Sequence, residues 1–219
     1  MNHKTNHKLK DPGSAITHLI AMISAAVFAI PLIHKATFQS EDATIAMTIF
    51  ICSMILLYGA STLYHSLDIS IKVNKFLKRL DHSMIFVLIA GSYTPICMLV
   101  LPSKYGIPML IYIWTMAFIG ILVKIAFVFC PHWVSSSIYI FMGWTCVFAF
   151  RIIIENLSHG AFLWLLVGGI IYTIGGILYA FDLPIFHKLP KNFGRHEIFH
   201  LFVMGGSLCH FIVMYLYLL

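Results

Sequence analysis

Three histidines in this sequence have the residue type and the spacing of metal ligands. His196 and His200 stand four residues apart at the start of an apolar stretch that runs to the C-terminus, and His65 ends another apolar stretch far upstream. Residues i and i+4 share one helix face, about 6 Å apart along the axis, so the pair can turn toward one ion. Neutral imidazole suits zinc and also other transition metals. The pattern predicts a zinc site formed by His65, His196 and His200.

Two more polar residues fit a catalytic zinc site. Three protein ligands with a water in the fourth position are typical of catalytic zinc, whereas structural zinc is usually closed by four side chains. We expect Asp81 to act as general base or to orient a ligand, and Ser61 to stabilise a developing oxyanion. Two other interpretations stay open: Asp81 as an interfacial acid paired with Arg79 or Lys78, and Ser61 as a packing residue bonded to its own helix.

The elements that must position these residues are membrane helices. Of the 219 residues, 60% are hydrophobic and only 10% are charged, and the mean hydropathy is +0.92. A hydrocarbon core of about 30 Å requires roughly 20 apolar residues per helix. Seven stretches of that length are predicted, at residues 14–34, 43–65, 83–101, 106–124, 133–151, 161–181 and 196–218. The sequence therefore predicts an all-α integral membrane protein, with one seven-transmembrane helix bundle over residues 14–219 after a short segment of residues 1–13.

The basic residues indicate how the bundle is oriented. Of the 14 Lys and Arg residues, all but Lys35, Lys104 and Arg151 fall on the side of the N-terminus. The positive-inside rule then places the N-terminus in the cytoplasm and the C-terminus outside. The formal net charge of +6 reflects this topology and contact with anionic lipid headgroups, and no nucleic-acid partner is indicated.

This topology predicts that the polar residues meet at one depth. The second helix ends at the cytoplasmic face, and the third and seventh begin there, the third just after Asp81. The longest connections, residues 67–81 and 182–195, adjoin the same histidines. Polar side chains are costly inside a bilayer, so a cluster at one level normally faces the protein interior and has a function.

Three further histidines have weaker predictions. His82 lies about 100° round the helix from Asp81, so we expect it at a headgroup or beside the site. His18 is near the cytoplasmic end of the first helix. We expect it either to be a partner of a ligand or to form an ordinary interhelical hydrogen bond. His210 is ten residues beyond His200, about 15 Å further along the helix, and is expected to be a satisfied packing residue.

Two acidic residues are expected to form ordinary ion pairs. Glu197 is predicted to contact Arg195, Lys191 or solvent. Arg151 and Glu155, four residues apart, are predicted to pair near the outer surface, where such a pair contributes little.

Several separated motifs resemble those of the bacterial haemolysin III family. This family belongs with the progestin and adipoQ receptors, in a wider group similar to alkaline ceramidases, which hydrolyse a lipid amide. The motifs are Ser61-Thr62-Leu63-Tyr64-His65-Ser66, Arg79-Leu80-Asp81-His82-Ser83 with Ala90-Gly91-Ser92-Tyr93-Thr94-Pro95, and His196-Glu197-Ile198-Phe199-His200-Leu201-Phe202 with Gly206-Ser207-Leu208-Cys209-His210-Phe211.

The resemblance implies seven membrane helices and a zinc ion bound by His65, His196 and His200, with the serine and aspartate roles at Ser61 and Asp81. One segment departs from many relatives. Before the first helix, where an acidic stretch is often found, this sequence reads Lys8-Leu9-Lys10-Asp11-Pro12. The departure bears on any cytoplasmic partner contact there and leaves the zinc residues intact.

Three functions are consistent with these features. The leading hypothesis is a zinc-dependent hydrolase of the cell membrane, acting on an amide or ester of a lipid that enters sideways between helices. The second is a membrane-homeostasis sensor or receptor in which a structural zinc joins the helices without turnover. The third, a pore-forming cytolysin, follows mainly from the family name, because the sequence shows no amphipathic pore-forming hairpin and no secreted toxin domain.

Overall fold

The computed structural model describes residues 9–181, 183–190 and 193–219, and these residues form helices and short connections without a strand. Seven helical spans are long and apolar enough to cross a membrane. The chain is therefore an all-α membrane protein with seven transmembrane helices. Its α-helices are α1 (Pro12–Thr37), α2 (Glu41–Ser66), α3 (Ile71–Pro95), α4 (Ser103–Ala126), α5 (His132–Gly143), α6 (Phe150–Asn156), α7 (His159–Ala180) and α8 (Arg195–Val213).

Four shorter helical segments complete or join these spans. Single π turns η1 (Ile96–Val100) and η4 (Met214–Leu218) extend α3 and α8, and the 3₁₀ segment η2 (Trp144–Ala149) links α5 to α6 within one span. The 3₁₀ segment η3 (Pro184–Lys188) lies in the connection from α7 to α8.

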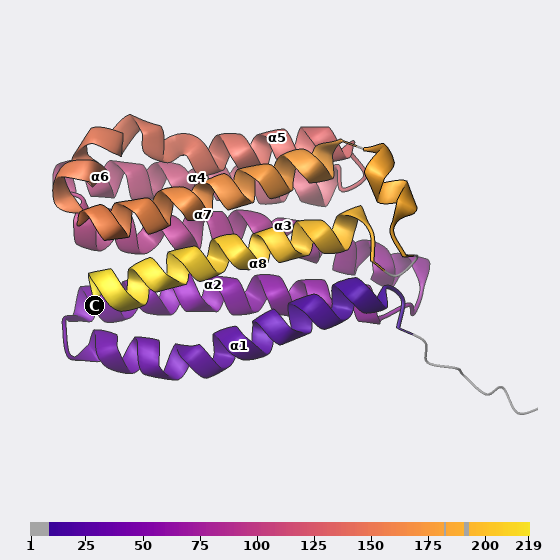
Figure 1. Cartoon of the computed structure of the whole chain (residues 1–219), viewed down its shortest axis with the longest axis horizontal. Coiled ribbons are helices and arrows are strands. Elements are labelled where there is room, and N and C mark those ends of the chain that lie inside the picture. Colours follow the sequence, from indigo (N-terminus) through magenta and orange to yellow (C-terminus); the bar gives the residue numbers. More distant parts are fainter. Residues whose placement is uncertain (1–8, 182, 191–192) are drawn as a thin grey trace, which may run out of the picture.

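The centre of the bundle consists of α2, α3 and α8. In their most apolar windows, 56%, 61% and 44% of the residues are buried, against 22% in each of the other four spans. Figure 1 shows α8 running diagonally between α1 and α7, with α2 and α3 behind it. The start of α1 and the C-terminus lie at opposite ends of the bundle. The three helices that carry the predicted site residues are thus the most enclosed ones.

The third helix begins earlier than predicted. Ser70 is its N-cap and accepts a hydrogen bond from the backbone N–H of Val73 at 3.3 Å, which satisfies one of the free donors of the first turn. Asp81 therefore lies three turns inside α3, and only residues 67–70 connect it to α2. The prediction that α3 starts after Asp81 was wrong because hydropathy marks only the apolar part of a helix. The first turns are amphipathic, with Leu77 buried and Lys75 exposed.

The helix of the fifth span is interrupted in the middle, and a tyrosine from α3 hydrogen-bonds backbone groups at the interruption. The Tyr93 hydroxyl donates to the carbonyl of Gly143 and accepts from the backbone N–H of Cys146 at 2.8 Å. In a bilayer, backbone groups released from a helix must find partners inside the protein. Tyr93 thus fixes the position of η2 against the centre of the bundle.

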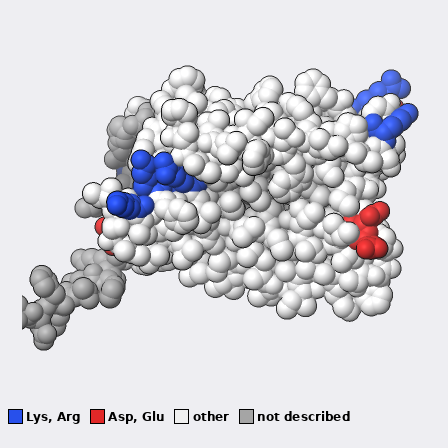
Figure 2. All heavy atoms as spheres, turned by 180° about the vertical axis from the view of Figure 1, so that it is seen from behind, with Lys and Arg blue, Asp and Glu red and all other residues white. Residues whose placement is uncertain are grey.

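The surface has the charge distribution of a membrane protein. On the face shown in Figure 2, charged side chains gather toward the two ends of the bundle, with a surface free of these charges between them. Large apolar side chains such as Ile30, Phe118 and Phe148 are 75%, 62% and 83% exposed. These side chains would be costly in water and are favourable against lipid.

Lys124 differs from the other basic residues at the histidine end because it is fully buried. Its ammonium donates to the hydroxyl of Ser135 and lies 3.2 Å from the sulfur of Cys130, in the loop between α4 and α5. The ring of Tyr139 lies 5.8 Å from it. Lys124 therefore belongs to an internal polar cluster and is not a surface charge.

Candidate metal centre

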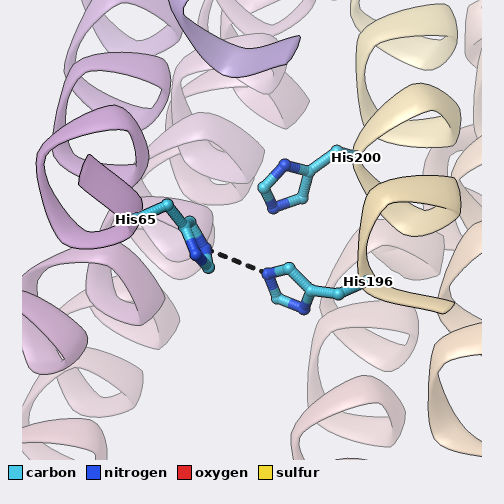
Figure 3. Close-up of side chains that lie close together, drawn as sticks. All are labelled: His65, His196 and His200. Atoms are coloured by element: carbon cyan, nitrogen blue, oxygen red, sulfur yellow. Dashed lines mark hydrogen bonds between the residues drawn. The ribbon is translucent and has the colours of Figure 1, made fainter. Parts of the chain in front are cut away.

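Three imidazole rings from α2 and α8 converge at the end of the bundle where α1 begins. The Nε2 atoms of His65 and His196 are 3.0 Å apart, and one ring nitrogen from each of His65, His196 and His200 lies within 4.8 Å of the others. Figure 3 shows the rings turned toward a common centre from the two helices. Zinc–nitrogen bonds of about 2.0–2.1 Å hold two ligand nitrogens within about 4 Å of each other. The closest pair, at 3.0 Å, is within this limit, and the set as a whole, at up to 4.8 Å, is slightly wider than a bound ion would hold it, so the three rings form a candidate site that would have to draw together around a metal.

The second nitrogen of His65 is fixed by a carboxylate. Nδ1 of His65 donates to Asp11 at 3.0 Å, and the backbone N–H of Asp11 donates to the carbonyl of His65 at 2.9 Å. Aspartate at a helix N-cap usually accepts from the first turn, but Asp11 makes no such bond at the start of α1. Its carboxylate is used for His65 instead. With the proton on Nδ1, the Nε2 lone pair of His65 points at Nε2 of His196 at 3.0 Å, and it is the atom that would bind a metal in place of this contact.

The second nitrogen of His200 is fixed by Thr17 on α1. The Thr17 hydroxyl lies 3.3 Å from Nδ1 of His200 and within 3.0 Å of the carbonyls of Gly13 and Ser14. The hydroxyl has one hydrogen, and when it donates this hydrogen to one of the two carbonyls it accepts from Nδ1–H of His200. The Nε2 lone pair of His200 is then also free. Both ligands thus have the tautomer that metal binding requires.

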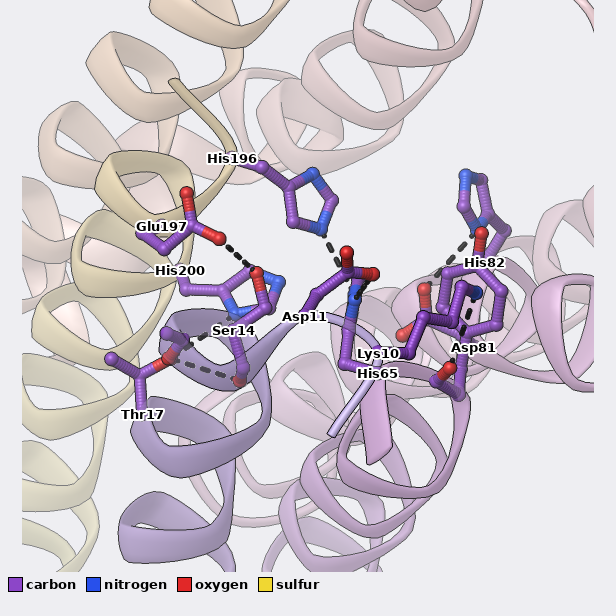
Figure 4. Close-up of polar contacts among 12 residues, drawn as sticks. Lys10, Asp11, Ser14, Thr17, His65, Asp81, His82, His196, Glu197 and His200 are labelled. Carbon is purple, nitrogen blue, oxygen red and sulfur yellow. Dashed lines mark hydrogen bonds and ion pairs between the residues drawn. The ribbon is translucent and has the colours of Figure 1, made fainter. Parts of the chain in front are cut away.

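Helix α1 is attached to the start of α8 by a further contact. Glu197 accepts from the backbone N–H of Gly194 at 2.7 Å and from the hydroxyl of Ser14. The prediction that Glu197 contacts Arg195 or solvent missed both of these partners, and Lys191 lies outside the described residues. Figure 4 shows these contacts grouped around the histidines. Sequence reasoning also missed Asp11 and Thr17, although an aspartate directly before Pro12 marks a helix start.

Asp81 and Ser61 are close to the histidines in the fold but not among the converging ligand atoms. Asp81 is 6% exposed, and its carboxylate lies 3.2 Å from Nδ1 of its neighbour His82, so these two adjacent side chains do approach each other. Ser61 is fully buried, and its hydroxyl makes no hydrogen bond with the described part of the chain. The alternative interpretation, in which Asp81 pairs with Arg79 or Lys78, is not supported, because no such pair occurs among the described ion pairs.

His18 lies directly against the cluster. Its ring stacks on that of His200 with the centroids 3.5 Å apart and an interplanar angle of 7°. It is 3% exposed, and neither ring nitrogen has a hydrogen-bond partner among the residues described. His18 is therefore a buried polar group with free hydrogen-bonding capacity beside the candidate ligand His200. Of the two roles considered for it, the interhelical hydrogen bond is absent among the described residues.

A long cavity leads from the metal centre into the bundle. Asp81, His18, His196 and His200 line one end, and His210 lies further along the same wall. Between and around them the lining is mostly apolar, with side chains from α3, α5, α6, α7 and α8 such as Leu88, Ile140, Phe162, Leu165 and Val203. An apolar slot that ends at a few polar groups is the usual form of a small-molecule site.

His210 is not the satisfied packing residue that was expected. Both of its ring nitrogens are shielded from solvent and have no hydrogen-bond partner in the described residues. The rim pair is as predicted, with Arg151 and Glu155 2.8 Å apart on an exposed surface.

The fold and the site together define a seven-helix membrane protein with an imidazole cluster at one end of its bundle. The sequence pattern of the family described as "Haemolysin-III related" matches residues 6–211. The chain is 40% identical to Hemolysin-3 of Bacillus cereus over 220 residues, which cover 100% of this chain and 96% of that protein. It is 39% identical to the Hemolysin-3 homolog of Bacillus subtilis (strain 168), over 93% of this chain and 92% of the homolog.

The chain therefore belongs to the haemolysin III-related family of membrane proteins. A more distant relative is the adiponectin receptor protein of Drosophila melanogaster, 25% identical over 92% of this chain and 49% of the receptor. The family and the seven spans make this chain a multi-pass protein of the cell membrane.

Proposed function

We propose that the chain is a zinc-dependent hydrolase that cleaves an amide or ester of a membrane lipid at the cytoplasmic face. The observation that carries this proposal is the convergence of three imidazoles at the polar end of an apolar cavity. A cluster of this kind inside a membrane bundle is costly to maintain and normally serves a ligand or an ion. The cavity supplies space for a lipid chain, which would reach it from the bilayer between helices.

Each residue has a distinct part in this reaction. His65 and His200 would hold zinc through the ring nitrogens that Asp11 and Thr17 leave free, and His196 would be the third ligand. Bound zinc lowers the pKa of a water and polarises the substrate carbonyl. Asp81, held near His82, accepts the proton of the attacking water and passes it to the leaving amine or alcohol, so that a fatty acid and the free headgroup are released.

Other groups orient the substrate and exclude water. The free ring nitrogens of His18 are available to the amide or ester group. The unpartnered hydroxyl of Ser61 remains the proposed donor to a developing oxyanion. The apolar lining of the cavity keeps bulk water from the reacting bond. Lysines on the first turns of α3, including Lys72 and Lys75, attract anionic headgroups at this end of the bundle.

The experiment compares metal content and lipid turnover in purified protein. Wild type, the double variant His196→Ala/His200→Ala and Asp81→Asn are incubated with a lipid amide and a lipid ester, and released fatty acid is measured by mass spectrometry. We expect wild type to contain zinc and release fatty acid, the double variant to lose both, and Asp81→Asn to keep zinc but lose turnover. The matched control is His159→Ala, at the exposed start of α7.

Two outcomes would contradict the proposal. Turnover that persists in the double variant would remove zinc from the mechanism. Bound zinc with no released fatty acid, together with a lower melting temperature in the double variant, would favour a sensor or receptor in which zinc joins α2 to α8.

A further inference from the structure

The deep end of the cavity contains one polar side chain that the proposed hydrolysis does not use. His210 lies ten residues after His200 on α8, about 15 Å further from the metal centre. Both of its ring nitrogens are buried without a hydrogen-bond partner in the described residues. A buried polar group normally has a partner, which is protein, water or ligand. Since His210 lines the cavity, a ligand in the cavity can supply that partner.

The neighbouring polar side chains do not supply a hydrogen-bond partner for His210, because they bond one another. The ring of Tyr172 lies 5.3 Å from that of His210, edge to face. The Tyr172 hydroxyl, however, bonds the hydroxyl of Ser207 at 2.7 Å, and Ser207 also accepts from Tyr58 at 2.6 Å. Thr173 is likewise satisfied, since it accepts from the indole N–H of Trp144 at 2.9 Å and donates to the carbonyl of Gly169 at 2.7 Å. Many of the remaining lining side chains, including Phe150, Ile153, Phe162 and Leu165, are apolar.

The imidazole itself defines what it can bind. A neutral ring has one N–H and one nitrogen that only accepts. The backbone carbonyl of Leu165 makes at most a weak hydrogen bond with the ring, and it can engage the N–H but not the accepting nitrogen. That nitrogen needs a donor. In a cavity shaped for an apolar chain, a hydroxyl group on the chain is the simplest donor.

The ring is held in place by a glycine on α7. A Cβ atom on Gly168 would lie 2.5 Å from Cδ2 and 2.8 Å from Nε2 of His210. Side chains essentially never approach this closely, so the ring occupies space that only glycine leaves open. The position of His210 in the cavity is thus determined by the packing of α7 against α8.

We propose that the cavity binds a lipid whose acyl chain carries a hydroxyl group partway along its length, and that His210 accepts a hydrogen bond from this hydroxyl. The inference rests on the proposed function only in placing the polar end of the lipid at the metal centre. The substrate class that the cavity favours is then a lipid with a hydroxylated acyl chain, in preference to one with an unsubstituted chain.

The test measures binding without cleavage. Purified protein binds a fluorescent fatty acid, which is displaced by stearic acid or by its monohydroxy isomers with the hydroxyl at successive chain positions. We expect one mid-chain isomer to bind roughly five-fold more tightly than stearic acid, the gain of about one net hydrogen bond. In His210→Phe, the preference should disappear while stearic acid binds as in wild type. His210→Gln, which keeps a donor and an acceptor, should retain part of the preference.

A second variant moves the ring without removing it. Gly168→Ala should reduce the preference or shift it to another hydroxyl position, because its Cβ displaces His210. Equal affinity for all the acids in wild type, no binding of any acid, or an unchanged preference in His210→Phe would overturn the inference. Because free acids have no bond to cleave, these results are independent of whether the protein hydrolyses a lipid, and missing turnover would leave the preference intact.

Discussion

The carboxylate of Asp11 and the ring of His65 join the first two helices at the histidine cluster. His65 donates to Asp11 at 3.0 Å through Nδ1, and the two residues also share a backbone hydrogen bond of 2.9 Å. The side chain of Asp11 is 44% exposed, whereas that of His65 is 4% exposed. A half-exposed acid thus orients a buried imidazole so that its other nitrogen faces the two histidines of α8.

The first prediction concerns this carboxylate. Asp11→Asn should weaken zinc binding by about 10- to 100-fold, because removing such a partner of a ligand histidine loosens its orientation and its basicity. Competition with a zinc chelator measures the affinity, and Asp11→Glu should recover part of it. Asp68→Asn is the control, since Asp68 is an exposed acid at the same end that bonds Asn74. Equal affinities of Asp11→Asn and wild type would show that the contact does not support a metal.

The hydroxyl of Thr17 should act on His200 in the same way, with a smaller effect. Thr17→Val removes the acceptor for Nδ1–H of His200 and keeps the shape of the side chain. We expect zinc affinity to fall by about two- to ten-fold, the range for one neutral hydrogen bond. Thr17→Ser keeps the hydroxyl and should bind zinc like wild type. If the serine and valine variants behave alike, the methyl packing of Thr17 matters and its hydroxyl does not.

Two glutamates should differ in their contribution to stability. Glu197→Ala removes hydrogen bonds to the N-terminus of α8 and to Ser14, so we expect a loss of about 2 kcal/mol in the free energy of unfolding. Glu155→Ala removes only an exposed pair with Arg151 and should cost less than about 0.5 kcal/mol. Thermal unfolding in detergent compares the two variants. A similar loss in both would mean that Ser14 and Glu197 do not couple α1 to α8.

Cys130 should be the most reactive thiol at this end of the bundle. Partial burial raises the pKa of Cys130, but hydrogen bonds from Ser135 and Lys124 and the charge of Lys124 outweigh it, so the pKa is lowered overall. Because the thiolate is the nucleophile, the alkylation rate rises with pH through this pKa, and a lowered pKa shifts the profile to lower pH. Lys124→Met should shift the profile back to higher pH.

The measurement is the rate of reaction with iodoacetamide between pH 6 and pH 10, a range that spans the pKa of an ordinary thiol of about 8.5. Cys130→Ser gives the background from the other cysteines. Ser135→Ala should produce a smaller shift in the same direction as Lys124→Met. A profile that is identical in wild type and Lys124→Met would contradict the interaction between the ammonium and the thiol.

The spans could be predicted from the sequence because a bilayer requires long apolar stretches. Hydropathy found all seven, but it missed the first turns of α3, where lysines alternate with buried residues such as Leu77. It ended the fourth span at Lys124 and counted this residue as a basic end, but could not show that the lysine is buried, since a buried lysine requires partners that come from another helix, here Ser135. Helix bounds near charged residues therefore depend on tertiary contacts.

The histidine cluster could be predicted because its spacing within α8 is local and its depth follows from the topology. The partners of the ligands could not. Asp11 and Thr17 reach His65 and His200 only because α1 crosses the ends of α2 and α8. The periodicity of the sequence does not predict that crossing. The unsatisfied state of His210 depends likewise on a cavity formed by several helices, which is a property of packing and not of one segment.

Two of the three converging imidazoles lie in the last helix of the chain. During synthesis, the first helix and the segment with His65 enter the membrane before α8 has been made. The three rings can meet only after the final span has been inserted and has packed beside α1. Assembly of the centre thus depends on completion of the seventh span, and a chain that stops short of α8 lacks it altogether.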